Sequence, residues 1–148
     1  MMPWSESVQT LVKPRTRRFR VLVAEDDAEM RRLVVETLRA DDYDVVELAD
    51  GGRLLVDVAA QIKAGGDGDP VDLVVSDIRM PICTGLQILE ALRVAHWRTP
   101  VILMTAFGDA ATRKRAEDLQ AVLFDKPFDM DDLRTAVANL LPRDRPAF

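Results

Sequence analysis

Cysteine and histidine are nearly absent from this sequence, and their scarcity excludes several kinds of site. Cys83 is the only cysteine and His96 the only histidine. A single cysteine cannot form a disulfide within the chain, and the two residues together cannot supply a Cys-rich or His-rich metal site. His96 precedes an apolar run and has no second histidine near it, so we interpret it as a surface or turn residue.

Long hydrophobic runs and an excess of positive charge are also missing. No apolar run reaches membrane-spanning length, and the N-terminus lacks the apolar core of a signal peptide. The formal net charge of −5 argues against a nucleic-acid-binding surface. These absences predict a cytoplasmic protein with no membrane partner and no direct nucleic-acid partner.

The residues that are present predict one domain. Apolar residues make up 48% of the 148 positions, which is enough for a single core. Residues 1–18 show no sustained period and end in a basic cluster, so we expect a flexible N-terminal tail, and residues 142–148 form a short C-terminal tail. The domain is therefore expected over residues 19–141.

Within the domain, short apolar runs alternate five times with helical patterns. The predicted strands are Phe19–Ala24, Val45–Ala49, Val71–Ser76, Pro100–Met104 and Ala121–Phe124. The predicted helices are Met30–Leu38, Leu55–Ile62, Leu86–Leu92, Asp109–Leu119 and Leu133–Leu140. Strands that alternate with helices indicate βαβ units and a parallel sheet. The predicted fold class is α/β, with a single doubly wound (βα)5 domain.

Polar side chains follow four of the five predicted strands. Glu25 and Asp26 end the first strand, Asp77 the third, Thr105 the fourth and Lys126 the fifth. Because the carboxyl ends of parallel strands lie at one edge of a sheet, these side chains are expected to converge. Three adjacent carboxylates repel one another, and a bound divalent cation such as Mg²⁺ removes that cost. An isolated Asp77 would be interpreted as a turn residue, but the set predicts a site.

These motifs resemble those of the receiver domains of two-component response regulators. The matching stretches are Val21–Asp26, Ser76–Pro81 with Gly85, Leu103–Ala106 and Lys126–Phe128. They follow the family order and cover the chain from about residue 19 to 141. The stretches Ser76–Pro81 and Met104–Asp109 further resemble receivers of the nitrogen-control enhancer-binding type. The resemblance implies a flavodoxin-like fold with a five-stranded parallel sheet in the order 2-1-3-4-5.

The resemblance also implies how the site would work. Asp77 would be the nucleophile that takes a phosphoryl group from a phosphohistidine of a sensor histidine kinase or a histidine phosphotransfer protein. The cofactor would be Mg²⁺ or Mn²⁺ at Asp77, with Asp26 as a direct ligand and Glu25 acting through water. The main-chain carbonyl of Arg79 would complete the protein ligands. The chain would be a phosphoacceptor that assists its own phosphorylation and dephosphorylation, not an enzyme.

Other positions would read out the phosphorylated state. Lys126 would pair with the phosphoryl oxygens, Thr105 would hydrogen-bond them, and Pro127 would follow Lys126 through a cis peptide bond. The family usually has an aromatic residue three positions before the lysine. Here Leu123 stands at that position and Phe124 follows it, so either Leu123 replaces the aromatic residue or Phe124 takes over part of its role.

The output of such a switch is not specified by the motifs. The partner would be a downstream protein target or a missing output domain, and a homodimer could form through the fourth helix, fifth strand and fifth helix. The chain would be either a stand-alone receiver or a fragment of a longer regulator. We also expect Arg79 and Phe107, which flank the site, to tune the lifetime of the phosphorylated state.

Two other functions use similar residues. A hydrolase of the haloacid-dehalogenase type needs a second aspartate two residues after the nucleophile, where this chain has Arg79. A receiver-like scaffold that works without phosphorylation usually lacks the acidic pair, the nucleophile or the lysine, and this chain has all of them. Both alternatives are therefore less consistent with the residues than phosphoryl transfer.

Overall fold

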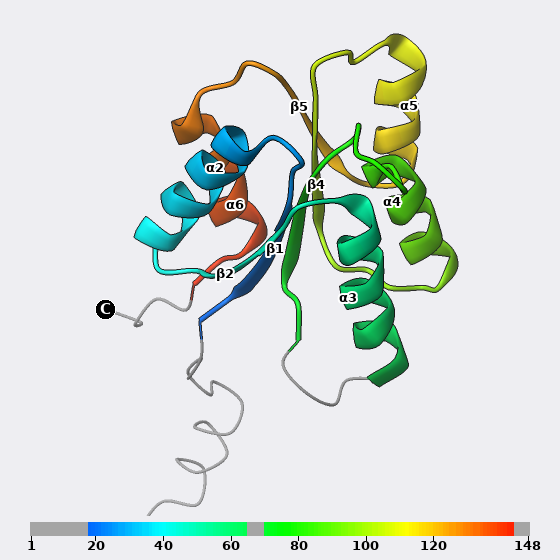
Figure 1. Ribbon diagram of the computed structural model, residues 1–148, viewed down its shortest axis with the longest axis horizontal. Coiled ribbons are helices and arrows are strands. Elements are labelled where there is room, and N and C mark those ends of the chain that lie inside the picture. The colour runs from blue at the N-terminus through cyan, green and yellow to red at the C-terminus, as the bar shows by residue number, and fades with distance from the viewer. Residues whose placement is uncertain (1–17, 65–69, 144–148) are drawn as a thin grey trace, which may run out of the picture.

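The computed structural model describes residues 18–64 and 70–143, which form one α/β unit (Figure 1). The strands are β1 (Arg20–Ala24), β2 (Asp44–Leu48), β3 (Leu73–Asp77), β4 (Val101–Thr105) and β5 (Val122–Asp125). The helices are α2 (Ala28–Ala40), α3 (Gly51–Ala64), α4 (Gly85–Val94), α5 (Ala110–Asp118) and α6 (Met130–Leu140). All strand pairs are parallel, in the order β2-β1-β3-β4-β5.

The predicted fold is confirmed, with small shifts at the ends of the elements. The third strand begins at Leu73, two residues after the predicted start at Val71, and it includes Asp77 as its last residue. The predicted tail over residues 1–18 lies outside the described residues except for Arg18. Residues 65–69 and the last five residues, 144–148, also lie outside them.

Two layers of helices cover the sheet. Helices α2 and α6 lie on one face, where Val35 and Leu133 pack against strand residues such as Val23 and Met104. Helices α3, α4 and α5 lie on the other face, as Figure 1 shows. Strands β3 and β4 are buried over their whole length, because helices cover both of their faces. The residues that end these strands are therefore held by a rigid core.

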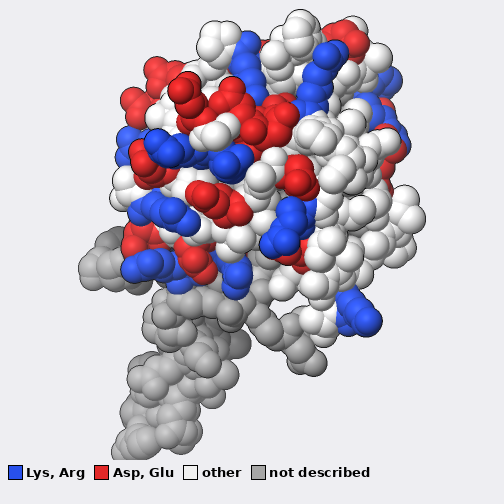
Figure 2. Space-filling view, viewed as in Figure 1, with Lys and Arg blue, Asp and Glu red and all other residues white. Residues whose placement is uncertain are grey.

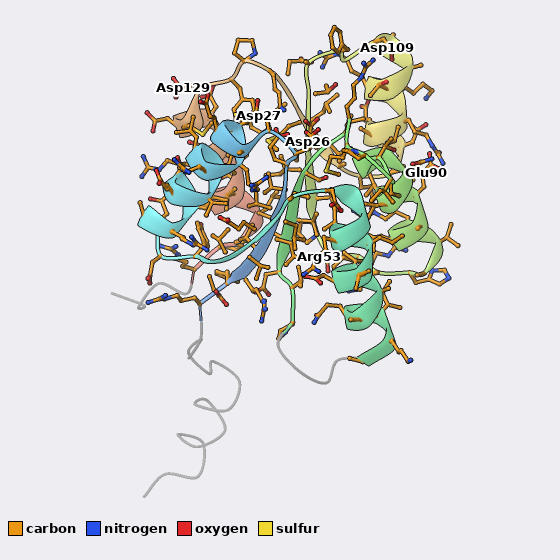
Figure 3. The ribbon with its side chains drawn as sticks, viewed as in Figure 1. Asp26, Asp27, Arg53, Glu90, Asp109 and Asp129 are labelled. Atoms are coloured by element: carbon orange, nitrogen blue, oxygen red, sulfur yellow. The ribbon has the colours of Figure 1, made fainter. Side chains whose placement is uncertain are left out.

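All five strands end at the same edge of the sheet, and the N-cap residues of four of the following helices lie shortly after the strand ends. Asp27, Thr84, Asp109 and Asp129 cap α2, α4, α5 and α6, and each side chain accepts a hydrogen bond from an amide of the first turn. Figure 3 labels three of these aspartates at the end of the molecule where Asp26 also lies. Short connections and early caps leave the strand-end residues little conformational freedom.

Helix α5 is attached less firmly than the others. Of its residues only Ala116 is buried. Exposed ion pairs add to its attachment, with Arg113 bonded to Asp125 of β5 and Arg115 to Glu90 of α4 at 2.9 Å. Exposed ion pairs contribute little to stability, so α5 is the helix that the core restrains least.

Among the described residues, no helix is both long enough and apolar enough to span a membrane.

Candidate functional site

Two acidic residues follow β1 and differ sharply in burial. Glu25 is fully buried, whereas the neighbouring Asp26 is exposed. The backbone of Glu25 is fixed from both sides: its amide donates to the carbonyl of Leu48 at 3.1 Å, and Arg31 donates to its carbonyl at 2.8 Å. The pair therefore presents one carboxylate inward and one toward solvent.

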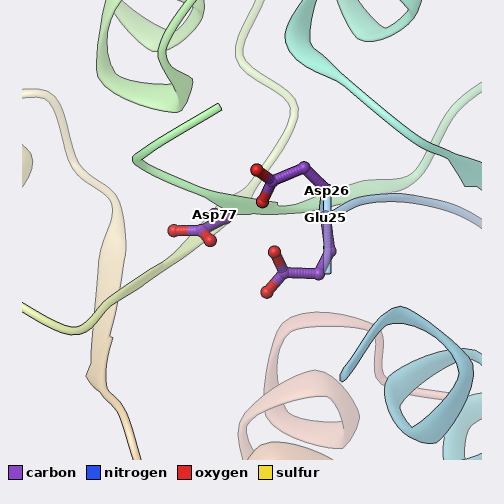
Figure 4. Close-up of side chains that lie close together, drawn as sticks. All are labelled: Glu25, Asp26 and Asp77. Atoms are coloured by element: carbon purple, nitrogen blue, oxygen red, sulfur yellow. The ribbon is translucent and has the colours of Figure 1, made fainter. Parts of the chain in front are cut away.

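Asp77 lies beside this pair because β3 is the neighbour of β1 in the sheet. Ala24 of β1 pairs in register with Ser76 of β3, so the residues that follow each of them are adjacent. One carboxylate oxygen from each of Glu25, Asp26 and Asp77 lies within 4.8 Å of the others. Figure 4 shows the three side chains pointing into the same space. Figure 2 shows acidic side chains gathered over this end of the molecule.

Lys126 approaches the carboxylates from the end of β5, the edge strand on the other side of β4 from β3. Its Nζ atom donates to Asp77 Oδ2 at 2.9 Å and to Glu25 Oε1 at 2.5 Å. It directly follows β5, and its amide donates to the carbonyl of Thr105 at 2.7 Å. The peptide bond between Lys126 and Pro127 is cis. Lys126 thus joins two of the three carboxylates with one cation.

Burial and charge shift the protonation of this group. Burial raises the pKa of Glu25 to about 7, because the charged form loses its hydration and the interaction with Lys126 compensates only in part. For Lys126 burial lowers the pKa, but hydrogen bonds from the ammonium to Glu25 and Asp77 outweigh it, so the pKa is raised. Lys126 therefore stays positively charged near neutral pH.

Thr105 completes the set of strand-end residues. It is the last residue of β4 and is buried. Its hydroxyl oxygen accepts a hydrogen bond from the amide of Phe107 at 3.1 Å. A hydroxyl can accept one hydrogen bond and donate another, so Thr105 can bind a new acceptor at the site while the Phe107 amide ties it to the loop between β4 and α5.

The two loops above the site touch each other. The guanidinium carbon of Arg79 lies 4.5 Å from the centre of the Phe107 ring, in a cation–π contact. The amide of Arg79 donates to Asp77 Oδ1 at 3.2 Å. Arg79 and Phe107 therefore form part of the rim around Asp77, which is only 7% exposed.

Leu123 and Phe124 lie on opposite faces of β5. Leu123 pairs with Leu103 and packs on the side of α3, α4 and α5. Phe124 packs on the side of α2 and α6, where its ring lies 5.3 Å from that of Phe128. Successive residues of a strand alternate between faces, so these two side chains cannot fill the same space.

The donor set fits a small hard cation. Three carboxylates supply only oxygen ligands, and Mg²⁺ and Mn²⁺ prefer oxygen over nitrogen or sulfur. Asp26 is exposed, so a cation can reach it from solvent. Glu25 is buried and already bonded to Lys126, which suits a contact through water better than direct ligation.

Two residues that contribute to this arrangement were missed in the sequence. Arg31 holds the carbonyl of Glu25, but arginines are common on exposed helix faces and give no local signal of such a contact. Ile82 stands in the loop after Asp77 with a φ of 75°. A β-branched residue such as isoleucine rarely adopts a positive φ, so the sequence predicts a negative φ at this position.

Comparisons with known proteins agree with the geometry. The model of the response regulator receiver domain family matches residues 21–138. Sporulation initiation phosphotransferase F of Bacillus subtilis is 31% identical over 124 residues, which cover 83% of this chain and 94% of that protein. Regulatory protein AtoC of Escherichia coli is 34% identical over 125 residues, which cover 82% of this chain. The match spans only 25% of the length of AtoC.

Solved structures show the same fold. The receiver domain of a Francisella response regulator superposes with a TM-score of 0.73 and 25% identity, covering 83% of this chain and 96% of that one. The response regulator TrrA of Thermotoga maritima, solved in complex with Mg²⁺ and BeF, gives a TM-score of 0.69 and 26% identity, covering 83% and 99%. With its acidic cluster at the carboxyl edge of the sheet, this chain belongs to the response regulator receiver domain family of two-component systems.

Proposed function

We propose that Asp77 is the residue of this receiver domain that accepts the phosphoryl group. The observation that carries the proposal is the position of Lys126, whose Nζ atom binds Asp77 and Glu25 together. One oxygen of Asp77 is bonded to Lys126 and the other to the amide of Arg79, so the carboxylate is fixed in orientation. A fixed carboxylate beside a cation suits phosphoryl transfer, in which positioning and charge stabilisation dominate.

The proposed reaction transfers the phosphoryl group from a phosphohistidine to a carboxylate oxygen of Asp77. The P–N bond of the donor breaks while the P–O bond to Asp77 forms. The donor nitrogen keeps the electron pair of the broken bond and leaves as neutral imidazole, its other ring nitrogen carrying the proton. Lys126 then shifts its hydrogen bond from the carboxylate toward the phosphoryl oxygens and offsets their charge.

The acidic group would hold a divalent cation during this step. Asp26, Asp77 and the main-chain carbonyl of Arg79 would bind Mg²⁺ or Mn²⁺ directly, and Glu25 would bind through water. When bound, the cation would neutralise negative charge on the transferring phosphoryl group. The contribution of the chain itself is to hold the carboxylates within 4.8 Å of one another at a solvent-accessible edge.

Thr105 and Leu123 are the proposed switch residues. A phosphoryl oxygen on Asp77 would accept a hydrogen bond from the O–H of Thr105, whose oxygen accepts from the Phe107 amide, so a shift of Thr105 toward the phosphoryl group would pull on the loop that follows β4. Movement of the loop after β4 would open space near Leu123, which lies on the α4 and α5 side of β5. Phe124 faces the other side, so we assign the switch position to Leu123.

The proposed partners follow from this chemistry. The phosphodonor is a sensor histidine kinase or a histidine phosphotransfer protein, and the chain assists its own phosphorylation and dephosphorylation. The phosphorylated form would act on a downstream protein or an output domain, with dimerisation through α5, β5 and α6 as one mode. The cytoplasmic location and the nitrogen-control type remain predictions.

Incubation with Mg²⁺ and acetyl phosphate, followed by intact mass measurement, tests the proposal. The wild-type chain should gain one phosphoryl group, and Asp77→Asn should gain none. Chelation of the metal with EDTA should abolish the gain in the wild-type chain. A wild-type chain that gains no phosphoryl group under these conditions would support the scaffold function instead.

A further inference from the structure

Asp125 and Arg113 form an ion pair between the end of β5 and the start of α5. Asp125 is the last residue of β5 and pairs in register with Thr105 of β4, so the sheet fixes its backbone. Arg113 belongs to the helix that the core restrains least, in which Ala116 is the one buried residue. The ion pair therefore joins a fixed strand to a weakly held helix.

The loop between β4 and α5 lies against this ion pair. A Cβ atom on Gly108 of that loop would lie 2.6 Å from Asp125 Oδ1 and 3.2 Å from Arg113 Nη2. It would also lie 3.2 Å from the Cγ2 atom of Thr105. Both partners of the ion pair and Thr105 thus pack on the same glycine, so a movement of the loop at this point changes the contacts of all three side chains.

This packing links the ion pair to the phosphorylation site. A phosphoryl group on Asp77 would draw the Thr105 side chain toward it and pull on the Phe107 amide, which donates to the Thr105 hydroxyl at 3.1 Å. Gly108 directly follows Phe107, so the same movement would shift Gly108 and the start of α5. Asp125 belongs to the sheet and would stay in place. Phosphorylation would therefore separate the two partners of the ion pair.

We propose that the ion pair between Asp125 and Arg113 is a latch that holds the loop and α5 in the unphosphorylated arrangement. The inference rests on the proposed function of Asp77. A contact that exists in only one of two arrangements shifts the balance between them by its own strength, which for an exposed ion pair is up to about fivefold. Loss of the latch should favour the phosphorylated arrangement, so a ligand that requires this arrangement should bind more tightly.

Arg115 of the same helix provides a matched control. It pairs with Glu90 at 2.9 Å, and its side chain is 48% exposed, as is that of Arg113. Glu90 belongs to α4, and Figure 3 shows it well away from Asp109, at which the loop meets α5. Replacing either arginine by glutamine removes one positive charge and one exposed ion pair from α5, but only Arg113→Gln opens the latch.

The test measures the affinity of the chain for beryllofluoride, an analogue of the phosphoryl group, in the presence of Mg²⁺. Isothermal titration calorimetry gives the dissociation constant for the wild-type chain, Arg113→Gln, Asp125→Asn, the double variant and Arg115→Gln. We expect the constant to fall about threefold in each of the first two variants, as the strength of an exposed ion pair implies. The double variant should bind as tightly as either single variant, and Arg115→Gln should bind like the wild type.

Charge alone predicts a different pattern. Beryllofluoride is an anion, so the loss of a positive charge in Arg113→Gln should weaken its binding, and the loss of a negative charge in Asp125→Asn should strengthen it. The latch predicts tighter binding in both variants. Arg113→Gln therefore separates the two explanations, because they predict changes of opposite sign.

An unchanged or weaker affinity in Arg113→Gln would overturn the latch. So would an equal gain in Arg115→Gln, which would indicate a general loosening of α5. A gain in the double variant equal to the product of the two single gains would also overturn it, because the two residues would then act independently.

The same experiment separates the latch from the proposed function. If the wild-type chain binds beryllofluoride but the latch variants bind it no more tightly, the latch is overturned and the acceptor role of Asp77 stands. If the wild-type chain neither binds beryllofluoride nor gains a phosphoryl group from acetyl phosphate, the proposed function is contradicted and the latch with it.

Discussion

At the scale of single residues, the fully buried Glu25 makes the stability of this domain depend on pH. Its pKa is about 7 in the folded chain and 4.5 when unperturbed. Between these values the folded state binds more protons than the unfolded state, so the free energy of unfolding should fall as the pH rises. The loss should be on the order of 2 kcal/mol across this window.

Chemical denaturation of the wild type and of Glu25→Gln measures this effect. Glutamine does not ionise, so the free energy of unfolding of Glu25→Gln, relative to that of the wild type, should increase from about pH 4.5 to pH 7. Taking the difference between the two proteins cancels the contributions of other carboxylates, such as Asp41, whose pKa is lowered by Arg134. A constant difference over this range would show that Glu25 titrates normally.

The ring of Phe107 should affect how long the phosphorylated state lasts. Its ring lies beside Arg79 above the site, and it is mostly exposed. We predict that Phe107→Ala shortens the lifetime of the phosphorylated state severalfold, because the ring shields the aspartyl phosphate from water. The decay of the phosphorylated mass after removal of acetyl phosphate gives the rate. Phe107→Leu keeps most of the bulk and should decay more slowly than Phe107→Ala; an unchanged rate in Phe107→Ala contradicts the shielding role.

At the scale of elements, the start of α3 and the loop between β3 and α4 are packed backbone against backbone. A Cβ atom on Gly51 would lie 1.9 Å from the carbonyl oxygen of Cys83, so any side chain there must displace the loop. A Cβ atom on the next residue, Gly52, would meet only the side-chain atoms of Ile82 and Asp50, at 3.1 Å or more. The two neighbouring glycines therefore differ in what surrounds them.

We predict opposite outcomes for the two substitutions. Gly51→Ala should lower the free energy of unfolding by about 1–3 kcal/mol, because the displaced loop is overpacked. It should also slow phosphorylation by acetyl phosphate, since the same loop carries Arg79. Gly52→Ala should be neutral or slightly stabilising, because alanine favours helices over glycine by about 1 kcal/mol. Thermal unfolding and intact mass spectrometry measure both effects, and equal losses in the two variants would contradict the role assigned to the loop.

At the scale of the whole molecule, a cation bound to the folded state alone should stabilise the domain. The three carboxylates come from two strands that are far apart in sequence, so the unfolded chain has no such site. At tenfold excess over its dissociation constant, Mg²⁺ should add about 1.4 kcal/mol to the free energy of unfolding. Thermal unfolding with MgCl₂, compared with NaCl at equal ionic strength, measures this.

Asp26→Asn serves as the control for the cation. It removes one of three crowded negative charges, so without metal it should be at least as stable as the wild type. It should gain little from Mg²⁺, because the exposed ligand is gone. If Asp26→Asn were stabilised by Mg²⁺ as strongly as the wild type, the cation would be binding elsewhere.

The fold could be predicted from the sequence because its signals are local. The apolar runs that form β3 and β4 are buried throughout, and their lengths and spacing indicate strands covered on both faces. The family motifs then supplied the strand order, which periodicity alone does not contain. The predicted start of the third strand was two residues too early, because Val71 and Asp72 are as compatible with a strand as with the irregular segment that they form.

The sequence by itself determined which residues meet at the edge of the sheet, because a parallel sheet brings every strand end to one side. Only the tertiary structure decided which of these residues are buried and which contact one another. Glu25 is buried and Asp26 exposed although they are neighbours, and Lys126 contacts Glu25 across 101 positions of sequence. The strained turn at Ile82 was likewise decided by the packed loop, against the preference of the residue. Burial and contact depend on strand register and on packing between distant segments, which no local pattern encodes.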